Sequence, residues 1–113
     1  MNEIYINKWK SQLKKGTLSF MVLHILKGNE YYGYELIENI KNRAKVAIAE
    51  GTLYPLMNRL KDEGLVTAKW VEQESGIPRK YYCLTEQGEE TLGGMQQHWE
   101  TIQKTINQFK SQS

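Results

Sequence analysis

GTLYPLMNRLKDEG, residues 51–64, is the stretch of sequence that decides the fold. Four of its apolar residues recur at the spacing that places side chains on one face of an α-helix: Leu53, Leu56, Met57 and Leu60. Pro55 is compatible with a helix that starts near Gly51, because the N–H groups of a first turn have no partner inside the helix. The pattern therefore predicts a helix that ends at Gly64 and buries this apolar face in a core.

The opposite face of this predicted helix is polar. It carries side chains that donate hydrogen bonds, together with one proline: Thr52, Tyr54, Pro55, Asn58, Arg59 and Lys61. Hydroxyl groups donate to phosphates, and Asn and Arg side chains reach base edges in the major groove of DNA. The start of a helix also attracts a phosphate. The face is typical of a DNA recognition helix, although any globular α+β domain leaves polar residues outside its core.

Two helices are predicted before this stretch. Apolar residues recur at helical spacing from Asn7 to Leu26 and occupy nearly every side after Gly16, so this helix should be buried on more than one side. A second helix is expected to begin near Tyr34. Its inward residues are Leu36, Ile37 and Ile40, and its outward residues are Glu35, Glu38, Asn39 and Lys41. Residues 45–49 are expected to form one strand or an extended link.

A β-hairpin and a long helix are predicted after the same stretch. Strand-like composition covers residues 65–73 and 79–84, and residues 74–78 between them have the composition of a turn. Thr85 is the expected N-cap of a last helix from Glu86 to Phe109. Three helices followed by a hairpin are the element order of a winged helix-turn-helix, so the predicted fold class is α+β and mostly α. Two cations of the second strand would meet the DNA backbone: Arg79 and Lys80.

The composition fits one globular domain and excludes several classes of protein. The chain has 113 residues, of which 40% are hydrophobic and 25% charged, and its net charge of +2 identifies no partner by itself. Cys83 is the one cysteine and no secretory signal pattern occurs, so the chain is expected in the cytoplasm. Residues 18–26 are too short an apolar run to span a membrane. The two histidines and Cys83 do not have a metal-binding spacing and no catalytic motif occurs, so we expect no metal, no cofactor and no enzyme activity.

The last predicted helix carries a second apolar stripe. Its residues are separated by 3, 4, 3, 4 and 3 positions, as in the seam of a coiled coil: Leu92, Met95, Trp99, Ile102, Ile106 and Phe109. This pattern predicts a homodimer, with residues 1–85 as the DNA-binding domain and residues 86–113 as the dimerisation helix. Two recognition helices one DNA turn apart, roughly 34 Å, would then read a palindromic site in double-stranded DNA. In the alternative interpretation, the stripe docks on its own domain.

Trp99 is an unusual residue for such a seam, because coiled coils prefer aliphatic side chains there. Near a two-fold axis it would face its copy in the other chain, and two indoles with a gap between them can hold a planar aromatic small molecule. The other residues predicted for this pocket are Leu18, Lys14 and Gln103, with Trp9 as a further candidate. Alternatively, Trp99 is only a large core side chain. The Gly93-Gly94 pair of the same helix is interpreted as a hinge or as a point of close helix approach.

Four motifs of the chain resemble the PadR family of bacterial winged-helix transcriptional regulators, in particular its small members with a single C-terminal helix. They are GTL from Gly16, YGYEL at residues 32–36, GTLYPLMNRLKDEGLV at 51–66 and PRKYYCLTEQG at 78–88. The resemblance implies a homodimeric cytoplasmic repressor that binds an inverted-repeat operator and is released by a small ligand. It also implies a pocket at the dimer interface, lined by a tryptophan at the position of Trp99. The wing departs from the family pattern at Ile77, where an arginine is usual.

The expected DNA-binding residues combine the helix face, the wing and the start of the second helix: Tyr34, Thr52, Tyr54, Pro55, Asn58, Arg59, Lys61, Arg79 and Lys80. A different class of function stays open at this point. A dimeric winged-helix interaction protein would bind a partner without reading DNA. Ile77 favours this alternative, and so do the acidic residues in and around the recognition helix, which are Glu50, Asp62 and Glu63.

Overall fold

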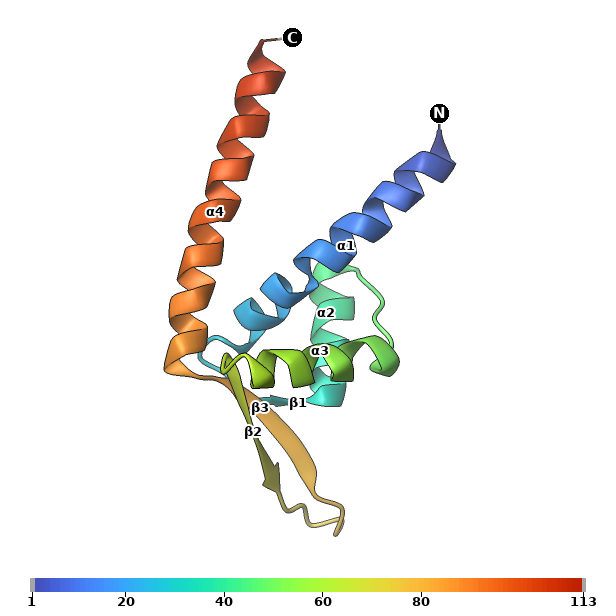
Figure 1. Cartoon of the computed structure of the whole chain (residues 1–113). Helices are drawn as coiled ribbons and strands as arrows, with labels where there is room; N and C mark the ends of the chain where they lie inside the picture. The colour runs from blue at the N-terminus through green and yellow to red at the C-terminus, as the bar shows by residue number, and fades with distance from the viewer. Residues whose placement is uncertain (1, 113) are drawn as a thin grey trace.

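The computed structural model describes residues 2–112. Its elements in chain order are α1 (Glu3–Leu26), β1 (Tyr31–Tyr32), α2 (Gly33–Ala44), α3 (Glu50–Asp62), β2 (Val66–Val71), β3 (Arg79–Leu84) and α4 (Glu86–Ser111). The three strands form one antiparallel sheet in the order β1-β3-β2. In Figure 1 the β2–β3 hairpin extends to the end of the molecule opposite the two chain termini. The predicted class, α+β and mostly α with a wing, is confirmed.

Both long helices extend beyond their predicted ends. α1 begins four residues before Asn7, because the Asn2 side chain accepts a hydrogen bond of 3.0 Å from the backbone N–H of Tyr5 and so caps an earlier start. α4 begins where it was predicted, with the Thr85 hydroxyl oxygen accepting a hydrogen bond of 2.9 Å from the Gly88 N–H. It ends two residues after Phe109.

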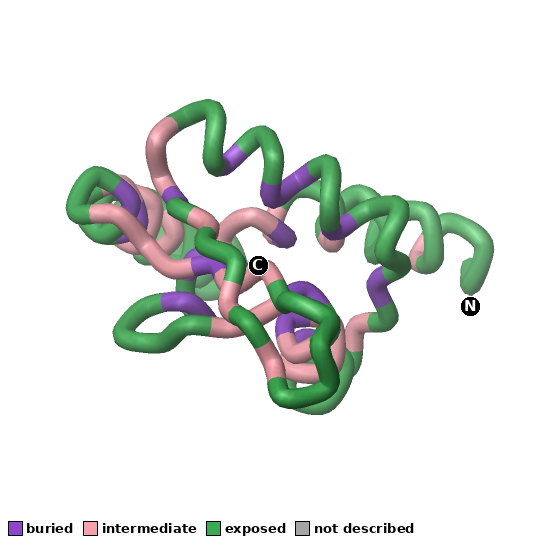
Figure 2. Tube along the Cα trace, turned by 90° about the horizontal axis from the view of Figure 1, so that it is seen from below, coloured by how far each residue is buried: buried purple, intermediate pink, exposed green. Residues whose placement is uncertain are grey.

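The core lies between the C-terminal half of α1, α2, α3 and the sheet. The apolar face predicted for α3 is buried as expected, and it meets Leu36 and Ile40 of α2 in the same cluster. Figure 2 shows buried positions along the C-terminal half of α1 and none at its N-terminal end. Within one chain, the burial of the first helix is therefore limited to the segment after Gly16.

The surroundings of α2 differ from the prediction in two respects, the exposure of its polar residues and the strand β1, and they decide between the two alternatives for residues 45–49. Glu35, Glu38 and Asn39 are half-buried and not outward, and the Glu35 carboxylate accepts a hydrogen bond of 3.1 Å from the Tyr32 N–H at the helix start. Residues 45–49 form the extended link and not the strand, since they pair with no neighbouring strand. The two-residue strand β1 was not predicted, because so short a segment has no periodicity; it pairs Tyr31 with Tyr82 of β3.

The N-terminal half of α1 and the C-terminal half of α4 form two arms, which we define as residues 3–13 and 102–111. In Figure 1 they diverge from the rest of the molecule. Trp9 is 53% exposed, Ile106 51% and Phe109 67%. The stripe of α4 is thus divided, because Leu92 is buried against its own domain whereas the residues from Ile102 onward are exposed. Within residues 2–112, no helix combines the length and apolar character needed to cross a bilayer.

Candidate nucleic-acid interface

The exposed side of α3 is the centre of the candidate interface. All six residues predicted for this face are exposed: Thr52, Tyr54, Pro55, Asn58, Arg59 and Lys61. The four leucine and methionine residues on the other side fix the helix to the core. The N-cap residue Ala49 gives no side-chain cap to the helix start, and its carbonyl oxygen accepts a hydrogen bond of 3.0 Å from the Thr52 N–H, so the N–H groups of Glu50 and Gly51 are the ones left to meet an anion. A polar helix face held by an apolar anchor can enter a groove of DNA without disturbing the core.

Aromatic side chains join α3 to the start of α2. Gly33 lies directly under the Tyr54 ring, and a Cβ at this position would overlap the Tyr54 hydroxyl and ring atoms. The glycine therefore permits the close approach of the two helices. The rings of Tyr32 and Tyr34 stack with their centroids 6.4 Å apart, and Tyr34 is exposed beside the α3 face. This arrangement extends the surface of α3 with further phenol hydroxyls.

The two wing cations lie at the start of β3, directly after the turn of the hairpin. The guanidinium carbon of Arg79 is 4.4 Å from the centre of the Tyr32 ring, and Lys80 Nζ lies 5.9 Å from the Trp70 ring and 5.7 Å from the Tyr82 ring. In such contacts, electrostatic attraction to the negative face of the aromatic ring holds the cation in place. Both cations are thereby positioned next to α2 and α3.

The tip of the wing has the opposite character. Residues 72–78 contain two carboxylates, Glu72 and Glu74, and no lysine or arginine. Ile77, at the position where the family pattern has an arginine, is exposed. A tip of this composition is repelled by phosphates. The wing therefore offers its cations to DNA from the start of β3 and not from its turn.

Sequence reasoning did not include Trp70 and Tyr82 in this surface. The two strands bring Trp70 opposite Lys80 and Ala68 opposite Tyr82, so both rings flank the wing cations. The alternation in the sequence grouped Trp70 with Val66 and Ala68, but Val66 is buried whereas Trp70 is 67% exposed, because the hairpin extends beyond the core at that point. Trp70 and Tyr82 could be assigned to this surface only from the cross-strand register, which the sequence alone does not give.

Comparison with known proteins agrees with this geometry. The model of the transcriptional regulator PadR-like family matches residues 22–94. The chain belongs to the PadR-like family of transcriptional regulators. The crystal structure of a PadR-family regulator from Eggerthella lenta is similar with a TM-score of 0.86 and 31% identity, over 95% of this chain and 93% of that one. A PadR-like regulator from Bacillus cereus has a TM-score of 0.77 and 34% identity, over 87% and 95% of the two chains.

A longer relative is the negative transcriptional regulator PadR of Bacillus subtilis, with 27% identity over 66% of this chain. This PadR-like chain spans only 42% of the length of that protein. The resemblance identified from the sequence motifs is therefore shown at the level of the family. As a PadR-like protein, the chain is a DNA-binding regulator of transcription and not an enzyme.

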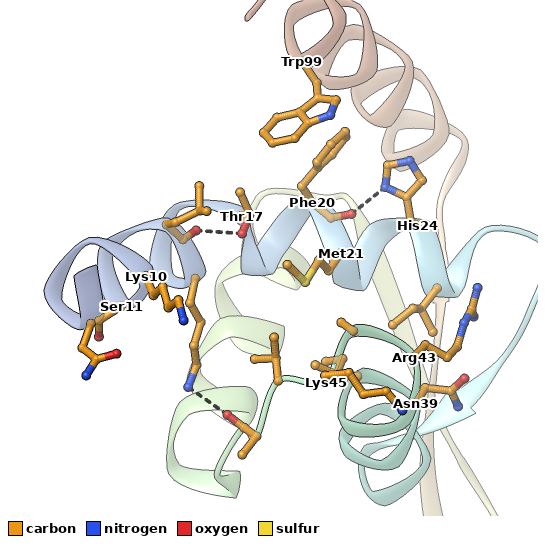
Figure 3. A pocket seen from close by; sticks show the side chains of 18 residues that line it. Lys10, Ser11, Thr17, Phe20, Met21, His24, Asn39, Arg43, Lys45 and Trp99 are labelled. Carbon is orange, nitrogen blue, oxygen red and sulfur yellow. Dashed lines mark hydrogen bonds between the residues drawn. The ribbon is translucent and has the colours of Figure 1, made fainter. Parts of the chain in front are cut away.

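The PadR-like chain also has two adjoining hollows along α1. One, of about 880 Å³, lies between α1, α2 and the link at residues 45–47, and the other, of about 680 Å³, lies between α1 and α4. Trp99 lines both, and Figure 3 shows its indole facing the Phe20 ring, with 5.8 Å between the ring centroids. Lys14 lines the first hollow, and its Nζ donates a hydrogen bond of 2.8 Å to the Ala47 carbonyl oxygen.

The remaining residues predicted for a ligand pocket lie elsewhere. Leu18 is buried in the core, and neither Gln103 nor Trp9 lines either hollow. Gly93 and Gly94 have open space where a Cβ would be, so neither makes a close approach to any other described part of its own chain.

Metal ligands do not gather in this PadR-like structure. His24 Nδ1 lies 2.9 Å from the Phe20 carbonyl oxygen and its Nε2 lies 3.2 Å from Gln96 Oε1. Among residues 2–112, no three His, Cys, Asp or Glu side chains are placed to hold a metal ion.

Proposed function

We propose that this chain is a transcriptional repressor that binds an inverted-repeat operator as a homodimer and is released by a planar aromatic ligand. The observation that carries the proposal is the polar, exposed face of α3 beside the two cations at the start of β3. Arg59 and Asn58 have the chemistry to read base edges, and Thr52 and Tyr54 to bind phosphates. The printed name of the Bacillus subtilis relative, a negative regulator, supports repression. The proposed place of action is the cytoplasm, with the DNA.

The two arms support the homodimer. Each exposes large apolar side chains at helical spacing, among them Trp9 on α1 and Ile106 and Phe109 on α4. Exposed apolar surface of this extent is typical of a contact with a second chain. In the proposal, residues 86–113 act as the dimerisation helix and residues 1–85 as the DNA-binding domain. A two-fold pairing of the arms would present two α3 helices to successive turns of DNA.

The hollows on either side of α1 support a ligand site. Trp99 and Phe20 supply aromatic surface to both, and Lys14 supplies a cation at the rim of one. Planar aromatic molecules bind well against the faces and edges of such rings. Because Lys14 also holds the link that leads into α3, a ligand that moved it would change the position of the recognition helix.

The DNA-binding part is tested by gel shift with the promoter upstream of the gene for this chain, at several salt concentrations. We expect a specific complex whose affinity falls steeply as salt rises, because phosphate contacts release counterions. Arg59→Ala should lower operator affinity by roughly 1–3 kcal/mol and relax specificity, if Arg59 reads a base. Lys41→Ala, which removes an equal charge from an exposed position on α2 outside both arms, is the matched control. Absence of a shift at every salt concentration would instead favour the interaction protein that does not read DNA.

The ligand part is tested by fluorescence quenching with phenazine as a planar aromatic probe. We expect the probe to quench the wild-type protein and the Trp70→Phe variant, which retains Trp99. The Trp99→Phe variant should lose most of this quenching because the probe no longer lies against an indole. Equal quenching of all three proteins would place the probe outside the proposed site.

A further inference from the structure

We propose that the wing contains a built subsite for one backbone phosphate of DNA, with Tyr82 as its buried hydrogen-bond donor. This inference rests on the proposed DNA binding and adds a site to it. The subsite is a hollow of about 450 Å³ between α3 and the hairpin, and we call it the wing hollow. The lining residues that matter here are Tyr54, Asn58, Trp70, Arg79, Lys80 and Tyr82.

The first observation is the state of the Tyr82 hydroxyl. The Tyr82 side chain is only 3% exposed, yet its hydroxyl makes no hydrogen bond within residues 2–112. Among residues 2–112, no fully buried side-chain oxygen or nitrogen lacks a hydrogen-bond partner. The Tyr82 hydroxyl oxygen is therefore not fully buried, and it reaches the surface of the hollow that Tyr82 lines. The buried ring holds this hydroxyl in place at the floor of the hollow. A ligand in the hollow can accept a hydrogen bond from it in place of water.

Burial and its neighbours keep this donor protonated. Burial raises the pKa of the Tyr82 phenol, and the nearby Tyr54 phenol raises it further. The hydroxyl of Tyr82 is therefore a neutral O–H donor throughout the range in which DNA is studied. Tyr54 lines the same hollow from α3, so donors from two elements face the same space.

The second observation is unbalanced positive charge around the hollow. Arg79 and Lys80 line it, whereas no aspartate or glutamate does. The single ion pair within residues 2–112 joins Lys69 to Glu30, so neither lining cation is neutralised by a carboxylate. Both are held against aromatic rings, which reduces the side-chain entropy that would be lost on binding an anion. Cations and phenol donors around one space are the chemistry that binds a phosphate.

Two further features favour a phosphate that belongs to DNA over a free phosphate ion. The hollow opens beside Asn58 on the exposed face of α3, where a DNA backbone would pass. The mostly exposed indole of Trp70 gives it an apolar wall suited to a deoxyribose. Glu72 and Glu74 place negative charge in the turn after β2, so the positive charge of the hairpin lies at the start of β3, which lines the hollow.

The test compares Tyr82→Phe with Tyr81→Phe in gel shifts on operator and non-operator DNA. Tyr82→Phe removes one hydroxyl and keeps the buried ring, and we expect a loss of affinity of at least roughly 10-fold for both DNAs, since a backbone contact carries no sequence information. The salt dependence should stay as in the wild type, because no charge is removed. Tyr81→Phe, the neighbouring residue outside the hollow, should bind as the wild type does.

A second variant keeps the proposal falsifiable if Tyr82→Phe folds poorly. Lys80→Gln should weaken binding to both DNAs and lower the slope of log affinity against log salt by about 0.9 per bound subunit. Unchanged binding by Tyr82→Phe and Lys80→Gln, with a wild type that binds DNA, would overturn the subsite alone. A wild type that binds no DNA at all would overturn the proposed function as well.

Inorganic phosphate distinguishes the two sources of the ligand. We expect phosphate ions to displace DNA no better than sodium chloride of equal ionic strength, because the hollow is shaped for a phosphate with its attached sugar. Binding of free phosphate that is lost in Tyr82→Phe, together with unchanged DNA binding by this variant, would assign the hollow to a free anion and overturn the proposal.

Discussion

The winged core and the two arms use the same hydrophobic periodicity with different results. In α3, apolar residues at helical spacing are buried within one chain, with Leu53 and Met57 fully enclosed. In α4, the same spacing continues from Leu92, which is buried, to Phe109, which is mostly exposed. Periodicity thus indicates that a helix face is apolar, but the partner that covers it depends on which elements the tertiary fold brings near. The core is complete in one chain, and the arms are not.

The largest expected effect breaks the arms without breaking the core. Ile106→Asp should weaken the proposed dimer by roughly 3–6 kcal/mol, because each of the two chains loses one buried apolar side chain worth about 1.5–3 kcal/mol. Sedimentation velocity at micromolar concentration should show the wild type as a dimer and the variant as a monomer. Thr105→Asp introduces the same charge beside the stripe and serves as the control. A wild type that sediments as a single chain would remove the basis of the homodimer.

The next effect concerns the core. Leu53→Ala should lower the free energy of unfolding by about 2–5 kcal/mol, since it leaves a cavity under the recognition helix. Denaturant unfolding, measured at a concentration where the chains are monomeric, gives this value. Phe109→Ala should change it by less than about 0.5 kcal/mol under the same conditions, because this side chain has no core to leave. Equal losses for the two variants would mean that the arm is part of the folded core.

Two glycines of α4 test where the packing of this helix against the winged core ends. A Cβ at Gly88 would overlap the backbone carbonyl oxygen of Leu65, so Gly88→Ala should destabilise the fold by about 1–3 kcal/mol. Gly93 has open space at the same position, and Gly93→Ala should stabilise the helix by up to about 1 kcal/mol. Thermal unfolding of the two variants measures both changes. Destabilisation by Gly93→Ala would support a functional hinge at the glycine pair.

The sequence predicted best what depends on local pattern. The face of α3, the N-cap Thr85 and the hairpin follow from spacing and from the hydrogen-bonding chemistry of single residues. The strand β1 could not be predicted, because its two residues form a strand only by pairing with β3.

The candidate site was predicted in part for the same reason. Residues on one helix face, such as Asn58 and Arg59, share a surface whatever the rest of the chain does. The association of Tyr82 and Trp70 with Tyr54 requires the register of the hairpin and its position against α3. Long-range geometry of this kind leaves no trace in the spacing of residues along the chain.

The smallest expected effect is a pH dependence of the free energy of unfolding, which comes from Tyr82 in the winged core and not from the arms. Because burial raises the pKa of Tyr82 in the folded chain, the unfolded chain loses this proton first as the pH rises. The stabilising contribution is fully present below the ordinary phenol pKa of about 10 and is lost as the pH rises through the higher pKa of the folded state. Tyr82→Phe should therefore lose less stability than the wild type when denaturant midpoints are compared between neutral and alkaline pH. An identical alkaline loss in the two proteins would show that Tyr82 is as well solvated in the folded chain as in the unfolded one, and the wing hollow would then lack its buried donor.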